Sequence, residues 1–189
     1  MASQFLFPDS LLSPGGWTGD YSDLDEVAAS DADFVYSKDR PNGSAIEIGL
    51  SNPASTPGGG LVTLNYRHAQ VQSGVIDGGG SATTLDVSLY QGGTLIASDV
   101  QQAPGGAWAT RSWQFDPAAV TDWTDLIFIA SADGGGGGPS SRRGVALSWI
   151  RMEIPGAETI YIGAAGQAAR YLGARASADL YLGEKAIWP

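Results

Sequence analysis

Short segments of alternating apolar and polar residues recur along this chain and constrain its fold more than any other feature. In the clearest one, residues 61–69, Val62, Leu64 and Tyr66 alternate with polar side chains. A period of two places alternate side chains on opposite faces of a β-strand. Glycine, proline and asparagine separate the segments and mark turns. We therefore predict strands at residues 32–37, 45–50, 61–69, 83–90, 94–100, 107–115, 126–130 and 144–154.

These predicted strands, with almost no helical pattern, indicate an all-β chain. The one helical signal is a short turn with Asp116 as N-cap and Pro117 in its first turn. Strands with turn signals at short intervals are typical of a jelly-roll-like antiparallel β-sandwich, which we expect at residues 26–155. Prolines and glycines interrupt residues 1–25, so we expect an irregular N-terminal segment there.

A ten-residue period follows the predicted sandwich. A tyrosine, one apolar residue and a glycine recur three times, starting at Tyr161, Tyr171 and Tyr181. Such a period indicates one small unit stacked on copies of itself. Three short strands are marginal alone in water, so we expect residues 156–189 to be a small β-repeat element that assembles with other chains. The predicted assembly interface consists of Ile160, Tyr161, Ile162, Tyr171, Leu172, Leu180, Tyr181, Leu182 and Trp188.

The charge balance excludes some classes of partner. Aspartate and glutamate number 20 against 10 lysines and arginines, a formal charge of −10. This balance disfavours binding to nucleic-acid phosphates and to anionic membrane surfaces. We also expect no membrane insertion and no secretory signal, because neither pattern is present. The absence of cysteine excludes disulfides and thiolate metal sites.

Residues that could carry catalysis are few. His68 is the only histidine, and it is in phase with the apolar positions of its strand, which favours a packed side chain over a catalytic or metal-binding one. A glycosidase needs two carboxyl groups at a defined separation. The sequence defines no such separation for the acidic residues of the predicted strands, Glu47, Asp86 and Glu153. We therefore predict no enzyme.

An acidic run near the N-terminus allows two interpretations. It comprises Asp20, Asp23, Asp25, Glu26, Asp31 and Asp33. Calcium takes six to eight oxygen ligands, but this spacing does not match an EF-hand loop. A Ca²⁺ site is one interpretation, and the favoured one is a solvated segment whose aspartates cap turns. We expect no other cofactor.

The aromatic residues also allow two interpretations. Six tryptophans and seven tyrosines could form a platform on which sugars stack, as in carbohydrate-binding modules. The favoured interpretation is core filling by Trp108, Trp113, Trp123 and Trp149. A platform requires exposed coplanar rings on one face, whereas core filling requires buried rings. Their exposure therefore tests the alternative of a carbohydrate-binding or host-glycan receptor-binding protein.

Four stretches resemble a group of tailed-phage virion proteins, and related parts occur in phage-derived gene transfer agents. They are residues 62–67, 85–97, 120–126 and 146–155. Tyrosine-leucine-glycine repeats that end in tryptophan-proline are also familiar in that group, although Arg170 here replaces an apolar residue. The resemblance covers most of residues 26–189.

The resemblance implies a non-enzymatic virion structural protein that is made in the bacterial host cytoplasm. Its place on the particle stays open between tail, baseplate, collar and head decoration or fibre. Its implied partners are other virion proteins and other copies of itself. We expect a homotrimer, because fibre-like phage parts are commonly threefold, and host-surface glycan is the alternative partner.

Overall fold

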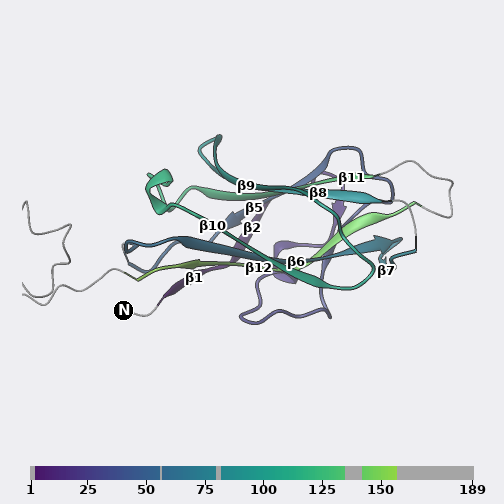
Figure 1. Cartoon of the computed structure of the whole chain (residues 1–189), viewed down its shortest axis with the longest axis horizontal. Coiled ribbons are helices and arrows are strands. Elements are labelled where there is room, and N and C mark those ends of the chain that lie inside the picture. Colours follow the sequence, from purple (N-terminus) through teal and green to yellow (C-terminus); the bar gives the residue numbers. More distant parts are fainter. Residues whose placement is uncertain (1–2, 56, 80–81, 135–141, 157–189) are drawn as a thin grey trace, which may run out of the picture. The chain divides into compact units, whose positions relative to one another are not determined.

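The computed structural model describes residues 3–55, 57–79, 82–134 and 142–156, which form a sandwich of two antiparallel sheets (Figure 1). Sheet A contains, in order, β10 (Ala109–Phe115), β6 (Val62–Gln72), β12 (Gly144–Ile154), β4 (Val35–Ser37) and β3 (Trp17–Thr18), with β1 (Gln4–Leu6) beside β12 and β7 (Val75–Ile76) beside β6. Sheet B contains, in order, β2 (Pro8–Ser13), β5 (Ser44–Leu50), β11 (Leu126–Gly134), β8 (Thr83–Gln91) and β9 (Thr94–Gln102).

The strand order confirms the predicted jelly-roll-like sandwich. All the predicted strands are present, as β4, β5, β6, β8, β9, β10, β11 and β12. They pair in the orders β4-β12-β6-β10 and β5-β11-β8-β9, so the chain crosses repeatedly between the sheets in the manner of a jelly roll. The predicted helical turn is the 3₁₀ turn η2 (Pro117–Ala119), where the Asp116 side chain accepts a hydrogen bond from the Ala118 amide.

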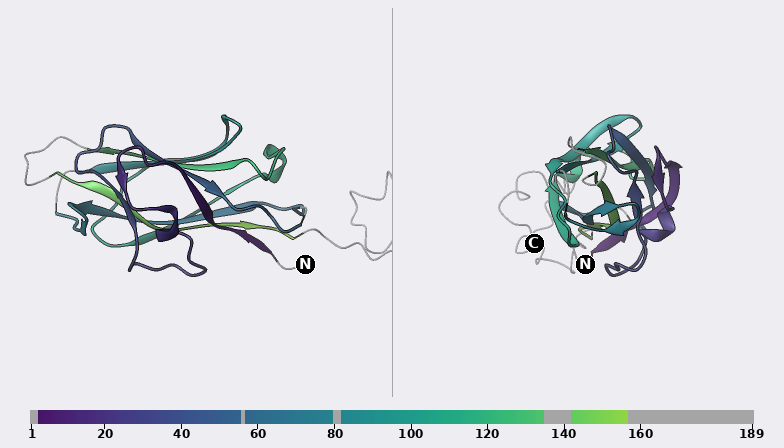
Figure 2. Two further views of the ribbon diagram at one scale, coloured as in Figure 1. Left: turned by 180° about the vertical axis from the view of Figure 1, so that it is seen from behind. Right: turned by 90° about the vertical axis from the view of Figure 1, so that its right-hand side faces the viewer.

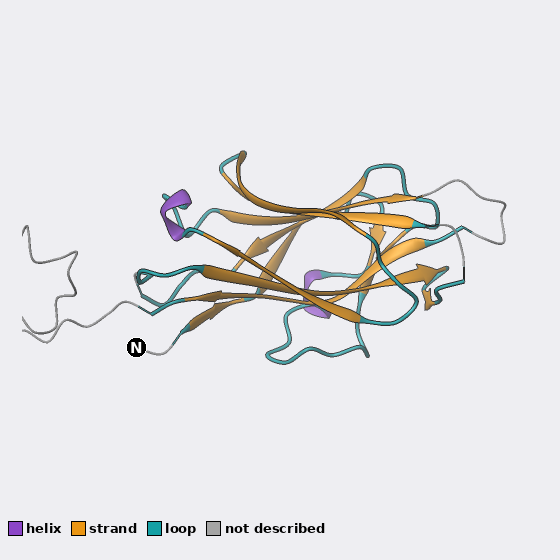
Figure 3. Cartoon of the chain, viewed as in Figure 1, coloured by secondary structure: helices purple, strands orange, loops and turns teal. Residues whose placement is uncertain are grey.

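The prediction that residues 1–25 are irregular is wrong. This segment contributes β1 and β3 to sheet A, β2 to sheet B, and the 3₁₀ turn η1 (Tyr21–Asp23) (Figure 3). Proline is tolerated because β2 is an edge strand, which leaves one side of its backbone without a ladder. Gly15 has a φ of +48°, and a Cβ there would lie 1.4 Å from the Ala45 carbonyl oxygen. Glycine is therefore required at position 15, in the turn by which the chain passes from β2 of sheet B to β3 of sheet A.

The core lies between the two layers, which Figure 2 shows from one end of the sandwich. Its largest fully buried side chains come from both sheets and include Leu64, Tyr66, Leu89, Phe128 and Ile150. Complete burial of an aliphatic or phenylalanine side chain stabilises a fold by about 1.5–3 kcal/mol. The alternation read from the sequence thus corresponds to inward positions on β6, β8 and β11.

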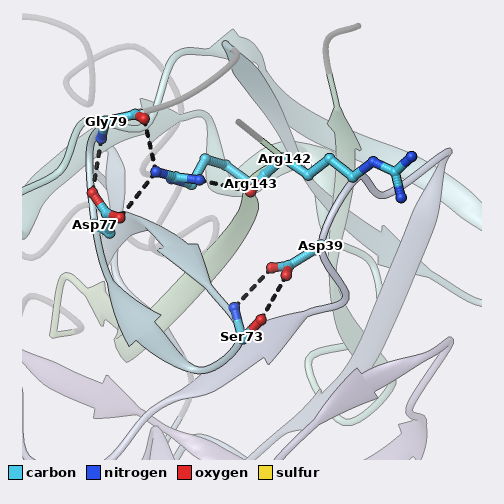
Figure 4. Close-up of polar contacts among 6 residues, drawn as sticks. All are labelled: Asp39, Ser73, Asp77, Gly79, Arg142 and Arg143. Atoms are coloured by element: carbon cyan, nitrogen blue, oxygen red, sulfur yellow. Dashed lines mark hydrogen bonds and ion pairs between the residues drawn. The ribbon is translucent and has the colours of Figure 1, made fainter. Parts of the chain in front are cut away.

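A buried arginine connects the start of β12 to the loop after β7 (Figure 4). Arg143 is 4% exposed, and its Nη2 donates to Asp77 Oδ2 at 2.9 Å and to the Gly79 carbonyl oxygen at 2.7 Å. Asp39 accepts hydrogen bonds from the amide and the hydroxyl of Ser73, each at 2.8 Å. These bonds fix the β6–β7 turn region at this end of the sandwich.

The predicted assembly interface lies outside the described residues. The chain divides into Met1–Ala157 and Glu158–Pro189, next to the predicted boundary at residues 155–156. The β-repeat element and its trimer therefore stay predictions. In the described part of the chain, no helix is both long enough and apolar enough to cross a membrane.

His68 belongs to a polar cluster between the sheets. It points inward from β6, is 4% exposed, and lies 5.6 Å from the Tyr66 ring, centroid to centroid. Neither ring nitrogen has a hydrogen-bond partner among the described residues. Tyr66 Oη donates to Asp99 Oδ2 at 2.9 Å, and Arg111 Nη2 lies 3.4 Å from Asp99 Oδ1. Burial, with a smaller effect of the Arg111 charge, lowers the pKa of His68 to about 4. The sequence-based expectation of a packed histidine is consistent with this placement.

This pKa predicts a loss of stability on mild acidification. Between pH 6.5 and about 4 the unfolded chain binds a proton at His68 and the folded chain does not, so stability falls as pH decreases through this window. The loss from this group approaches about 3 kcal/mol. His68→Gln removes this contribution. Urea denaturation of the original protein and of the variant at about pH 7 and about pH 4.5 measures their free energies of unfolding. An equal change of this free energy with pH in the two proteins would contradict the prediction.

Candidate functional site

The outer face of sheet A, turned away from the core, combines aromatic and polar side chains. On β12, Ala146 pairs with Tyr36 of β4 on one side and with Ala69 of β6 on the other. These three side chains share the outer face, because their neighbours Val35 and Leu147 are in the core. Both alanines are nevertheless completely buried. Larger side chains must therefore cover them.

Three aromatic rings form this cover, and we call them the aromatic cluster. Phe34, directly before β4, lies 5.6 Å from the Trp108 ring and 6.0 Å from the Tyr36 ring. Trp108 directly precedes β10, the edge strand that β6 and β12 separate from β4. Each of the three rings is half-buried. The short side chains of the two alanines let rings from distant strands meet, and part of each ring stays open to solvent.

Gly74 keeps the Tyr36 ring in place. A Cβ at this position would lie 3.2 Å from the Tyr36 ring and hydroxyl, and the glycine has a φ of +81°. A larger residue would therefore be strained and would also press on the ring. The β6–β7 turn thus supports one side of the aromatic cluster.

A row of polar side chains extends from the aromatic cluster along β6 and β10. Three cross-strand pairs form it, and each has a side-chain hydrogen bond. Arg67 Nη1 donates to Thr110 Oγ1 at 3.1 Å. Ser112 Oγ donates to Asn65 Oδ1 at 2.5 Å, and Gln114 Nε2 donates to Thr63 Oγ1 at 3.2 Å. The β10 members are exposed, so their remaining hydrogen-bonding capacity faces solvent.

The acidic loop before β4 is fastened onto this face. Asp31 accepts two hydrogen bonds from Arg67, at 2.6 and 2.8 Å, and a third from the Ser148 hydroxyl at 3.3 Å. The hydrogen bond from Arg67 is the main cause of the lowered pKa of Asp31. Trp149 Nε1 donates to the Glu26 carbonyl oxygen at 2.8 Å. Figure 3 shows the loop on the side of sheet A that faces away from sheet B.

A cation and two rings form the other end of the face. The guanidinium carbon of Arg151 lies 4.7 Å from the centre of the Phe5 ring and 4.9 Å from that of Trp149. Stacking of this kind contributes about 0.5–2 kcal/mol. Phe5 is 42% exposed, whereas Trp149 is 5% exposed. Arg151 therefore connects a buried ring to an exposed one.

Two members of the acidic run cap a turn, as the favoured interpretation predicted, whereas Asp31 fastens the loop through an ion pair that was not predicted. Asp20 and Asp23 form a reciprocal capping box at η1, and Asp31 pairs with Arg67. Asp25 and Asp33 are exposed. Within residues 3–55, 57–79, 82–134 and 142–156, no group of three or more histidine, cysteine, aspartate or glutamate side chains could hold a metal ion.

The tryptophans divide into two groups, so the core-filling interpretation is only partly right. Trp113 and Trp123 are partly buried and pack against the core. Trp149 is buried but on the outer side of sheet A, and Trp108 belongs to the aromatic cluster. Every described tryptophan and tyrosine is at least partly buried, and the cluster rings are tilted by 56° and 65°. They form an irregular surface and not a flat platform.

The acidic strand residues do not converge on one site. Glu47 on β5 and Asp86 on β8 both lie on the outer face of sheet B. On the strand between them, β11, Glu47 pairs with Ile129 and Asp86 pairs with Ser131. Glu153 lies on the outer face of sheet A, opposite Thr63. The core separates it from the other two.

No protein-family model and no curated protein matches the chain. Among solved structures, the chain is similar to the C-terminal CBM6 of a marine laminarinase from Zobellia galactanivorans, with 17% identity and a TM-score of 0.42 over 80% of this chain and 98% of that one. It is similar to the xylan-binding module CBM15, with 11% identity and a TM-score of 0.42 over 82% and 98% of the two chains. It is also similar to a cyclase from Fischerella sp., with 16% identity and a TM-score of 0.37 over 82% and 90%.

Proposed function

We propose that the sandwich is a non-catalytic glycan-binding module and that the outer face of sheet A is its binding surface. The observation that carries the proposal is the aromatic cluster over the two buried alanines, next to the polar row on β6 and β10. Apolar faces of sugar rings stack on aromatic side chains, and hydroxyl groups exchange hydrogen bonds with amides and hydroxyls. This face offers both kinds of group along one line.

The form of the surface indicates which class of glycan it would take. The rings of the aromatic cluster are tilted and half-buried, which suits a single soluble chain better than a flat crystalline surface. The protein carries a formal charge of −10, so a neutral glycan meets less repulsion than an acidic one. On this face Arg67 is paired with Asp31, and Arg151 is stacked between two rings. Neutral soluble polysaccharide is therefore the proposed ligand class.

Substitution at Trp108 tests this proposal. Affinity electrophoresis of the full chain against soluble β-1,3-glucan, soluble xylan and hydroxyethylcellulose should show retardation by at least one of them. Trp108→Ala should weaken that binding about tenfold, equivalent to about 1.4 kcal/mol. Leu95→Ala removes an exposed apolar side chain from sheet B and should leave binding unchanged. Absence of retardation by every polysaccharide, or unchanged binding by Trp108→Ala, would contradict the proposal.

A virion role is the second candidate function. It is supported by the resemblance to tailed-phage virion proteins and by the tyrosine-glycine repeat that begins at Tyr161. In this role the repeat would assemble the particle component, and the sandwich would be the part displayed, with host-surface glycan as a compatible ligand. The proposed mechanism is association through apolar strand faces. It would stabilise the assembly by about 25 cal/mol for each Å² of apolar surface that is buried between the chains.

Light scattering during size exclusion tests the assembly step. The full chain should have three times the chain mass of 19.5 kDa, and a chain that stops at Pro155 should be monomeric. The reason is that the truncation removes the whole predicted β-repeat element and leaves the strands of the sandwich complete. A monomeric full chain would show that the repeat does not drive self-assembly.

A further inference from the structure

The outer face of sheet B carries a row of paired residues across all five strands. Backbone pairing places Ser10, Gly49, Ile127, Tyr90 and Leu95 side by side, in that order, from β2 to β9. The last three are apolar or aromatic, and Leu95 is 51% exposed. The described residues place no further strand or helix over this row. Sheet B therefore presents a partly apolar outer surface.

A pocket of about 250 Å³ opens at the β2 end of this row. Gly49 contributes to it because the glycine has no side chain, and a Cβ there would lie 2.3 Å from Ser10 Oγ. Leu12, at the rim, is 51% exposed. The pocket is lined by Asp9, Ser10, Leu12, Gly49, Leu50, Asn52, Thr124, Asp125, Leu126 and Ile127. Its lining is thus partly aliphatic and includes two aspartates.

Charge is divided unequally between the two sheets. The five strands of sheet B contain no lysine or arginine. In the described residues, the cations lie in sheet A or in loops outside sheet B, at Lys38, Arg40, Arg67, Arg111, Arg142, Arg143 and Arg151. The outer face of sheet B and its adjoining loop instead carry Asp9, Glu47, Asp86, Asp125 and Asp133. Among the described residues, the carboxylates next to the apolar row are therefore those of Asp9, Glu47 and Asp125, and the strands of sheet B contribute no cation beside them.

We propose that the outer face of sheet B is a docking surface for a partner protein whose contacting patch is apolar and basic, with one lysine or arginine side chain in the pocket. We choose a basic partner because charge complementarity adds attraction and steers association. The long aliphatic stem of such a side chain matches Leu12 and Ile127, and its charged end matches Asp9 and Asp125. The same face of a second copy would bring like charges together. The proposal is independent of glycan binding on sheet A.

A matched pair of peptides tests the proposal on the full chain. The probe is acetyl-Leu-Arg-Leu-amide, and its control has citrulline, which keeps the shape of arginine without its charge. Saturation-transfer difference NMR measures the binding of both. We expect the arginine peptide to bind at least tenfold more tightly, and Asp9→Asn with Asp125→Asn to abolish that difference. Asp25→Asn with Asp33→Asn is the matched control, because it removes two exposed charges from the loop on sheet A.

The two double variants distinguish binding at this pocket from attraction to the overall negative charge of the protein. Loss of the difference in the pocket variant alone would support the docking site. Equal binding of the two peptides, or an equal effect of both double variants, would overturn it. A fall in the number of peptide sites per chain as the chain concentration rises would assign the face to a second copy and would overturn the proposed partner.

Discussion

Strand β12 (Gly144–Ile154) is buried on both of its sides, and the outer face of sheet A depends on how its second side is covered. Its inward side chains, such as Leu147 and Ile150, join the core. Its outward side chains would face water in an ordinary sandwich. Here the aromatic cluster covers Ala146, and the acidic loop covers Trp149 through the Glu26 carbonyl group. A second layer of packing therefore lies on top of sheet A.

This second layer gives sheet A a shaped surface that needs little rearrangement. Phe34 packs against both other rings, the two alanines of the same face are completely buried, and a Cβ at Gly74 would lie 3.2 Å from the Tyr36 ring. The polar row is held by cross-strand hydrogen bonds. Groups that are ordered before binding lose less conformational entropy when a ligand arrives. A fixed array of rings and hydrogen-bonding groups is what recognition of a flexible glycan requires.

The two outer faces of the sandwich differ in the sign and the placement of charge. On sheet A, arginines are compensated by Asp31 or stacked on rings. On sheet B, the strands carry carboxylates without lysine or arginine. Since the core separates the faces, the proposed glycan on sheet A and the proposed protein on sheet B would not compete.

The alternation of apolar residues predicts the strands well because inward positions repeat every second residue. Residues 144–154 were predicted as a strand with the bounds that β12 has. The N-terminal strands were missed, since Pro8 and Gly15 interrupt any period and edge strands tolerate such residues. The aromatic cluster could not be predicted from the sequence either. Alternation places Tyr36 and Ala146 on faces of their own strands, but only the strand order shows that these faces meet.

Hydroxyl-radical footprinting of the full chain, with and without the polysaccharide that it binds, tests the central claim most directly. The account predicts reduced oxidation at Phe34, Tyr36 and Trp108, with no change at Leu12 and Leu95 on the opposite sheet, because a ligand on sheet A shields only that face. Protection of Leu12 and Leu95, with the aromatic cluster unchanged, would contradict it.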